Sequence, residues 1–322
     1  MKSYLMLAMT VLTISGCSST PSEPVAAYKD NSYPHVVNNV YITEPLRVDY
    51  KSEIAIAKLT QLINHANLEK EKLAQLLYDR GVIYDSLGLK SLAQLDFRRA
   101  LEVQPAHADA YNFIGIHLTL LGKYEQAFDA FDSALEINPE HGYVHLNRGI
   151  ALHYYGRYQL SIQDLETFHL KNTADPYRAV WLYLSEAEID REGARLRLLY
   201  NSTMLDKSKW AFQIIQMLLG EMDHKTFIKQ MGENLSNSRE LVDRLCEGYF
   251  YLAKSSLLDG EVERAKNYFR LALTTNVYEF VEHKYSRLEL QKLYIEAANA
   301  YKDSLLPEYA PDGDNEQPSN IN

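Results

Sequence analysis

Two histidines have a spacing that could bind a metal. His141 and His145 are four residues apart, so they could project from one face of a helix, which is one requirement of a zinc site. However, His141 falls at the junction between two repeated units, and no glutamate follows it to act as a general base. His145 occupies a position where the repeat usually has a large side chain. We therefore expect two structural histidines and no metal site, and a metal-dependent hydrolase ranks last among the functions considered.

Other reactive side chains also lack a catalytic setting. Cys246 starts a segment rich in Tyr and Leu, which predicts a buried structural thiol. The acidic pair Asp129 and Asp132 lies on the expected solvent side of a helix. The glycines fall at repeat positions and form no phosphate-binding loop, and no Ser or Cys has a recognisable nucleophile setting. We predict no catalytic residues, no enzymatic activity and no cofactor, although a spatial triad is invisible in a sequence.

The first residues indicate export. Lys2 precedes an apolar run from Tyr4 to Ile14, followed by Ile14-Ser15-Gly16-Cys17, the pattern of a signal peptide rather than of a membrane span. The cysteine after small residues resembles the bacterial lipobox. This resemblance implies cleavage before Cys17, a thioether-linked diacylglycerol on its sulfur and an acyl chain on its amino group. The alternative is an ordinary secretory signal that happens to end in cysteine. Ser18, in place of Asp, favours the outer membrane.

Composition fits an anchored helical domain. The chain has 322 residues, of which 46% are hydrophobic, and its net charge of −10 becomes −11 once Lys2 is removed with the signal peptide. This charge argues against nucleic acid and against binding to an anionic lipid surface. Cleavage would leave Cys246 as the only cysteine besides the lipidated Cys17, which excludes an intrachain disulfide. The 24 tyrosines suit stacked helices or an interface.

A period of 34 residues predicts the fold. Gly81, Gly115 and Gly149 share this spacing, and so do the glycines seven residues after each of them. In the second half of the units, Ala93, Ala127 and Ser161 repeat the spacing, as do Phe97, Phe131 and Leu165, and a proline closes the first two units. Paired helices with this pattern are the tetratricopeptide repeat, whose units bury their apolar faces by stacking. We predict an all-α tetratricopeptide-repeat helical solenoid with additional flanking helices.

The predicted organisation has ten segments. At the N-terminal end are a signal peptide (1–16), a lipidated N-terminus with a flexible, proline-containing tether (17–47) and a helix (48–73). Repeats follow at 74–107, 108–141 and 142–175. Next come a degenerate repeat with further helices (176–245), a C-terminal repeat (246–279), a capping helix (280–302) and an acidic tail expected to be disordered (303–322).

Four segments resemble one family of tetratricopeptide-repeat lipoproteins, the NlpI family of Gram-negative bacteria. They are residues 76–89 (LLYDRGVIYDSLGL), 145–152 (HLNRGIAL), 181–184 (WLYL) and 276–283, with Asn276-Val277 and Phe280-Val281-Glu282-His283. The resemblance spans about residues 50 to 290, behind the lipobox; residues 28–48 and those after 301 do not match. It implies a homodimeric, periplasm-facing outer-membrane lipoprotein. It also implies an adaptor that brings peptidoglycan endopeptidases to a tail-specific protease, regulating cell-wall remodelling and cell division.

The predicted partner-binding residues come from the first helix of each repeat, which lines the concave face of such arrays. They are Tyr78, Val82, Asp85, Asn112, Ile116, Thr119, Leu146, Ile150 and His153. This apolar, mildly polar set suits a hydrophobic or helical segment better than a carboxylate clamp. Two alternatives remain: later helices of the same chain fill the groove, or Tyr and Asp residues on the convex edges bind partners.

Two further expectations concern assembly and function. A terminal helix must hide an apolar face somewhere, so we expect a homodimer through residues 48–66 and the C-terminal helices. The alternative to the hydrolase adaptor is an assembly factor for an outer-membrane secretion or fibre machine. In that case the partner would be an integral outer-membrane protein.

Overall fold

The computed structural model describes residues 35–37, 40–65 and 67–305. All of them belong to one compact unit, Tyr33–Asn322, and the other unit, Met1–Ser32, lies outside the described residues. The predicted signal peptide, Cys17 and residues 306–322 of the predicted acidic tail therefore lie outside them as well.

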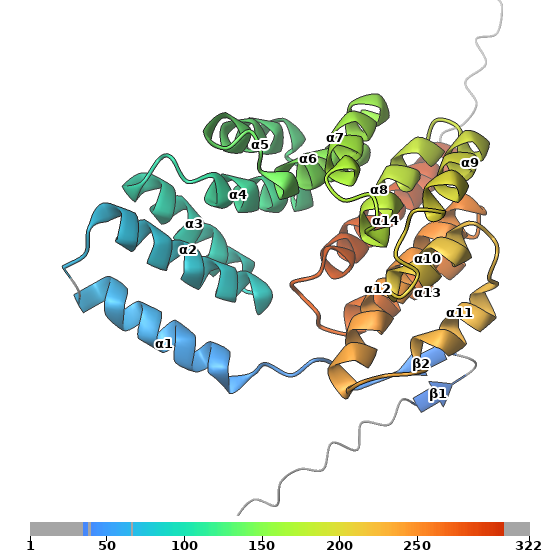
Figure 1. Cartoon of the computed structure of the whole chain (residues 1–322), viewed down its shortest axis with the longest axis horizontal. Helices are drawn as coiled ribbons and strands as arrows, with labels where there is room; N and C mark the ends of the chain where they lie inside the picture. The colour runs from blue at the N-terminus through green and yellow to red at the C-terminus, as the bar shows by residue number, and fades with distance from the viewer. Residues whose placement is uncertain (1–34, 38–39, 66, 306–322) are drawn as a thin grey trace, which may run out of the picture. The chain divides into compact units, whose positions relative to one another are not determined.

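The described part of the chain is built from helices that follow one another as antiparallel pairs (Figure 1). The first seven are α1 (Tyr50–His65), α2 (Lys70–Ser86), α3 (Lys90–Val103), α4 (Ala108–Leu120), α5 (Tyr124–Ile137), α6 (Gly142–Tyr154) and α7 (Tyr158–Leu170). The others are α8 (Pro176–Ala187), α9 (Arg191–Ser202), α10 (Ala211–Leu218), α11 (His224–Met231), α12 (Ser238–Leu258), α13 (Val262–Thr274) and α14 (Val281–Leu305). None of the helices in this part of the chain has the length and apolar character that a membrane span requires.

Each repeat holds its two helices together by the same close contact. A Cβ atom added to Gly115 in α4 would lie 2.5 Å from Cε1 of Phe131 in α5, which is closer than side chains approach. Phe131 is fully buried between the small residues Ala127 and Ala134. The recurring glycine therefore makes room for a large side chain of the paired helix, a phenylalanine in the first two repeats and Leu165 in the third, and this packing explains the period of 34 residues.

A larger core begins at α6 and includes the C-terminal helices. Trp181 of α8, Phe250 of α12 and Phe269 of α13 are buried in one cluster with residues of α10 and α11. Tyr285 of α14 joins this cluster and stacks on Tyr154 of α6, with ring centroids 5.0 Å apart. The C-terminal helices are thus packed onto the repeats rather than simply continuing the row.

The end of the predicted tether is ordered, which corrects the prediction for those residues. Strands β1 (His35–Val37) and β2 (Val40–Ile42) form an antiparallel hairpin. Within the hairpin, the Tyr41 carbonyl accepts from the Tyr249 hydroxyl at 2.7 Å. Beyond the hairpin, the Leu46 amide donates to the Thr275 carbonyl at 2.8 Å. Backbone groups that pair with the C-terminal helices cannot act as a free linker, so any tether ends before this segment.

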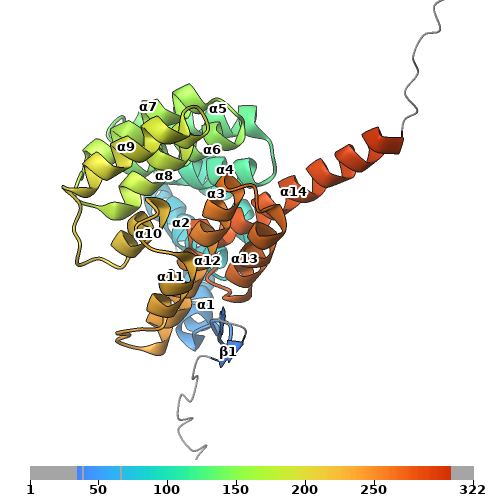
Figure 2. The same cartoon turned by 90° about the vertical axis from the view of Figure 1, so that its right-hand side faces the viewer.

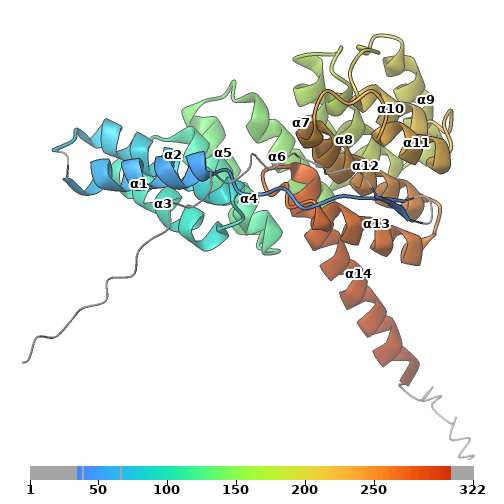
Figure 3. The ribbon, with the colours of Figure 1, turned by 90° about the horizontal axis from the view of Figure 1, so that it is seen from below.

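Helix α14 has two different halves. Most of its residues from Glu282 to Leu293 are buried, whereas every residue from Tyr294 to Ser304 is exposed. Figures 2 and 3 both show the second half extending beyond the helices that pack on the first half. The helix continues to Leu305, three residues past the predicted capping helix and into the predicted disordered tail.

Candidate functional site

The predicted groove residues are mostly inside the protein. Five of the nine are buried: Asp85, Asn112, Thr119, Ile150 and His153. The other four, Tyr78, Val82, Ile116 and Leu146, are half-buried. The structure thus corrects the prediction of an open partner-binding face for the buried five, which no partner can reach without displacing their neighbours.

Polar contacts show what covers this face. The Asp85 carboxylate accepts from His117 Nε2 at 2.8 Å and is paired with Lys284 Nζ of α14 at 3.0 Å. Further along, the Tyr154 hydroxyl donates to Glu289 Oε1 at 2.9 Å. Lys254 Nζ of α12 lies 2.7 Å from the same oxygen of Glu289. The alternative in which later helices of the same chain fill the groove is therefore the one that the structure shows at both of these places.

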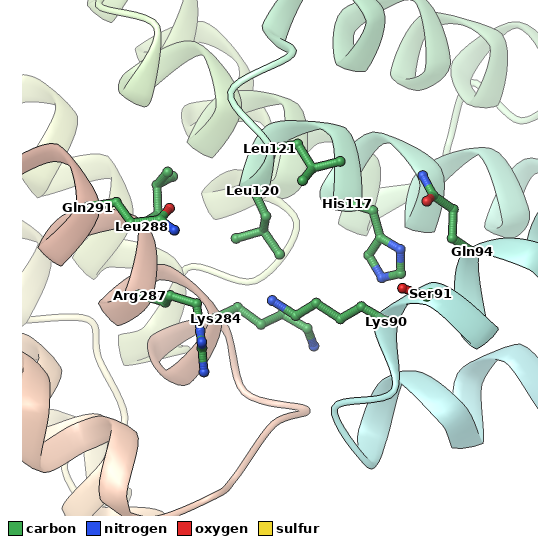
Figure 4. A pocket seen from close by; sticks show the side chains of 10 residues that line it. All are labelled: Lys90, Ser91, Gln94, His117, Leu120, Leu121, Lys284, Arg287, Leu288 and Gln291. Atoms are coloured by element: carbon green, nitrogen blue, oxygen red, sulfur yellow. The ribbon is translucent and has the colours of Figure 1, made fainter. Parts of the chain in front are cut away.

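A cavity of about 220 Å³ remains where α14 faces α3 and α4. We call it the cationic pocket; Figure 4 shows its side chains gathered around one space. Its lining residues are Lys90, Ser91, Gln94, His117, Leu120, Leu121, Lys284, Arg287, Leu288 and Gln291. Three of them are Lys or Arg and none is acidic, so this pocket suits an anionic group.

A second cavity, of about 560 Å³, lies on the other side of α14. We call it the aromatic pocket. Its lining residues are Tyr143, Leu146, Phe168, Asp175, Tyr177, Arg178, Trp181, Glu247, Tyr251, Glu279, Phe280, Val281 and Glu282. Leu146 is the only predicted groove residue among them. Aromatic and aliphatic walls with a few polar groups are typical of a site for a partner's apolar side chain.

Two buried carboxyls lie in the wall of the aromatic pocket. The Tyr177 hydroxyl donates to Glu247 Oε2, and the Tyr251 hydroxyl donates to Glu282 Oε1, each at 2.7 Å. Burial raises the pKa of Glu247 well above its usual range, and the neighbouring Glu282 raises it further. Burial also raises the pKa of Glu282. The raised pKa values favour the protonated, neutral form of both carboxyls, and a cationic group entering the pocket would favour release of the proton.

The two candidate metal-binding histidines contact different aspartates. His141 Nε2 lies 2.9 Å from Asp109 Oδ1, and its Nδ1 accepts from the Val144 amide at the start of α6. His145 Nδ1 lies 3.2 Å from Asp164, which is also bound by Arg148. Within the described residues, no group of three or more His, Cys, Asp or Glu side chains is placed to hold a metal ion. The histidines have structural contacts that join neighbouring helices.

Cys246 is fully buried between Val242 and Val277, as the sequence predicts. Burial raises the pKa of its thiol well above the usual range, and nearby Glu282 adds to the effect. A thiol that resists ionisation is a poor nucleophile, so Cys246 is a packing residue.

Sequence reasoning missed the residues that distinguish the two pockets. Lys90 is nearly 200 residues from Lys284 and Arg287, and nothing in the 34-residue period relates them. The hydrogen bond from Tyr177 to Glu247 likewise depends on α12 returning to α8. The one sequence signal near these residues is the segment 276–283, at the start of α14, whose resemblance to the NlpI family does not indicate which helices it contacts.

Comparisons with known proteins agree with the helical architecture. Residues 74–107 and 108–141 each match a family described as tetratricopeptide repeat. A tetratricopeptide repeat protein of Parabacteroides merdae is 16% identical with a TM-score of 0.45, over 76% of this chain and 100% of that chain. PilF of Pseudomonas aeruginosa is 16% identical with a TM-score of 0.42, over 70% and 99%. PilW, described as a type IV pilus biogenesis factor, is 17% identical with a TM-score of 0.40, over 77% and 100%. Likeness at this level carries nothing about function. The repeats and the helix pairs confirm the predicted tetratricopeptide-repeat solenoid.

Proposed function

We propose that this protein is an adaptor that holds a segment of a partner protein in the aromatic pocket. The observation that carries the proposal is the lining of that pocket, where exposed Tyr143 and half-buried Leu146 and Phe280 surround a cavity of about 560 Å³. Large aromatic side chains that are available to a partner dominate protein interfaces. Tetratricopeptide repeats are built to present such surfaces.

The finer proposal follows the resemblance of the sequence. The partners are peptidoglycan endopeptidases and a tail-specific protease, and the adaptor brings one to the other to regulate cell-wall remodelling and cell division. Lipids on Cys17 anchor the chain in the outer membrane with the repeats facing the periplasm. Metabolic labelling with palmitate tests the anchor, because Cys17→Ala should abolish the label while the chain is still made.

The test of the adaptor uses the chain from residue 18, without lipid, and purified endopeptidase and protease. We expect direct binding of both, and faster degradation of the endopeptidase when the adaptor is present. Tyr143→Asp should weaken endopeptidase binding about 30-fold, the equivalent of about 2 kcal/mol for an aromatic anchor.

Tyr200→Asp provides a matched control. Tyr200 on α9 is 69% exposed and Tyr143 is 62% exposed, but Tyr200 lines none of the pockets described above. Equal effects of the two substitutions would exclude the aromatic pocket as the binding site. Binding to secretin or fibre components, with none to the wall enzymes, would instead favour the assembly-factor role.

We also propose a homodimer through the terminal helices. No residue of α1 is buried, and its Tyr50, Ile54 and Leu62 are exposed. The second half of α14 presents exposed Ile295 and Tyr301. Two such apolar helix faces can cover each other in a pair of chains. Light scattering at micromolar concentration should give twice the chain mass, and Ile295→Lys should shift it toward one chain; a monomeric native protein would exclude the dimer.

A further inference from the structure

The cationic pocket has more positive charge than its own surroundings neutralise. Lys284 is paired with Asp85, but within residues 40–65 and 67–305 neither Lys90 nor Arg287 has a carboxylate within ion-pair distance. Burial and the nearby charges of Arg287 and Lys284 together lower the pKa of the Lys90 ammonium, and they outweigh the charge of Asp85, which is itself paired with Lys284. Such mutual repulsion is costly, and an anion between these side chains would relieve it.

Neutral donors surround the same space. Ser91 and Gln94 line the pocket from the first turn and a half of α3. Leu89, which precedes this helix, offers no side-chain acceptor to its first amides. The unpaired amides at a helix start favour an anion, and here they coincide with three cationic side chains from two helices. The pocket thus combines charge and hydrogen-bond donors suited to carboxylate oxygens.

We propose that the cationic pocket is a binding site for the carboxylates of an acidic, extended peptide, and that residues 306–322 of the same chain are its resident ligand. This segment contains Glu308, Asp312, Asp314 and Glu316 and has no Lys or Arg. Its charge is therefore complementary to the charge of the pocket. The proposal concerns regulation of the inner face and does not depend on the identity of any client protein.

Chain length determines which acidic residues can bind. The segment starts after Leu305, and α14 covers about 27 Å between Arg287 and that residue. An extended chain advances about 3.3 Å per residue, so Asp314 can return about 30 Å and Glu316 about 36 Å. Glu308 can return only about 10 Å and cannot reach the pocket. The ligand carboxylates are thus those of Asp314 and Glu316.

Occupancy would separate the two pockets in function. A peptide that reaches the cationic pocket would end between α3 and α14. An acidic segment of a partner protein would then have to displace it. The resident segment therefore lowers the apparent affinity of the cationic pocket for a partner's acidic segment and leaves the aromatic pocket free.

Zero-length carbodiimide cross-linking of the chain from residue 18 tests the proposal directly, since it joins a carboxylate to an amine only at contact distance. We expect mass spectrometry to find Lys90 joined to Asp314 or Glu316, with at least tenfold higher yield than for Lys229, an exposed lysine on α11 that serves as the internal control. Arg287→Gln, which removes one pocket charge, should reduce the yield severalfold. Mixing ¹⁵N-labelled and unlabelled chains separates links within a chain from links between chains.

A second measurement uses a fluorescent peptide of residues 306–322. Its affinity at low salt should be at least tenfold higher for the variant Asp312→Asn/Asp314→Asn/Glu316→Gln, whose own segment no longer competes, than for the native chain. Adding Lys90→Gln and Arg287→Gln to that variant should abolish the gain. Equal affinities for the native and neutralised chains, or no excess of Lys90 links over Lys229 links, would overturn the proposal. Links found only between chains would overturn its assignment to the same chain.

Discussion

The two sides of α14 bury carboxyl groups under opposite electrostatic conditions. At the cationic side, burial alone would raise the pKa of Asp85, but the hydrogen bond from His117 and the charge of Lys284 outweigh burial and lower it. At the aromatic side, Glu247 and Glu282 accept from tyrosine hydroxyls and neither forms an ion pair within the described residues. Burial raises both pKa values, and for Glu282 it outweighs the nearby charge of Lys284. Similar burial therefore accompanies a lowered carboxyl pKa on one side and raised carboxyl pKa values on the other.

The two sides should respond to pH in opposite directions. The lowered pKa of Asp85 contributes stability that is present above its unfolded pKa, near pH 4, and is lost as the pH falls through the folded pKa. The raised pKa of Glu247 contributes stability that is present below about pH 4 and is lost as the pH rises through the folded pKa. Acid should weaken the contact of α14 with the repeats, and alkali should weaken its contact with α8 and α12.

Removing the charge of Asp85 should have the largest effect. Asp85→Asn leaves Lys284, which is 7% exposed, buried without a carboxylate, and breaking such a pair costs about 3 to 5 kcal/mol. We expect this loss in the free energy of unfolding by urea at pH 7, shrinking as the pH is lowered below 4. Asp129→Asn, on the exposed face of α5, is the control and should change little. A loss for Asp85→Asn that does not depend on pH would mean that packing, not charge, holds this side together.

Substitutions at two glycines test how strongly the turn between α2 and α3 is affected by its contact with Tyr278. Gly88 and Gly122 have nearly the same left-handed φ, +75° and +71°, so alanine at either position costs about 1 kcal/mol. Only at Gly88 would the added Cβ meet another residue, Tyr278, at 3.0 Å. We expect Gly88→Ala to lower Tm more than Gly122→Ala does. Equal shifts would show that Tyr278 moves aside freely.

Glu247→Gln should stabilise the protein, in contrast to Asp85→Asn. Glutamine keeps an acceptor for Tyr177 without the charge, so at pH 8 the gain is about 1.4 kcal/mol for each unit by which the pKa is raised. The gain should disappear near pH 4, where glutamate is also neutral. Chemical unfolding at both pH values measures it, with exposed Glu136→Gln as the control. A loss of stability at pH 8 would show that Glu247 is needed as a charged group.

The smallest effect is expected away from both pockets. Arg195 and Glu192 on α9 form an exposed ion pair at 2.9 Å. Solvent screens such a pair, so Arg195→Gln should leave Tm unchanged within error. A measurable decrease in Tm would mean that an exposed ion pair also stabilises the fold. Burial would then not be what distinguishes the Asp85 pair from the exposed pairs.

The sequence predicted the repeats because their cause is local. Gly115 and Phe131 are in one helix pair, and the same contact recurs every 34 residues. The same period could not predict that α14 folds back onto the repeats, because the Asp85–Lys284 pair joins α2 in the first repeat to a helix that lies outside the repeats and almost 200 residues later. Burial of Ile150 and His153 followed from that return, and so the predicted open groove was wrong there. The sequence predicts a flexible tether around Tyr41, because the prolines and asparagines there give no periodic signal. In the structure, however, this segment forms hydrogen bonds with α12 and with the end of α13.

The short stretch from Tyr41 to Leu46 also affects the order in which the molecule can be completed. Its hydrogen-bond partners are Tyr249 and Thr275, more than 200 residues later in the chain. The repeats can form from local contacts while synthesis continues, whereas this closure has to wait until the C-terminal helices have been made. Until then, Tyr41, Leu46 and the surfaces that will receive them remain exposed to other proteins. The interval between emergence and closure is thus the period in which the chain is most vulnerable to proteases.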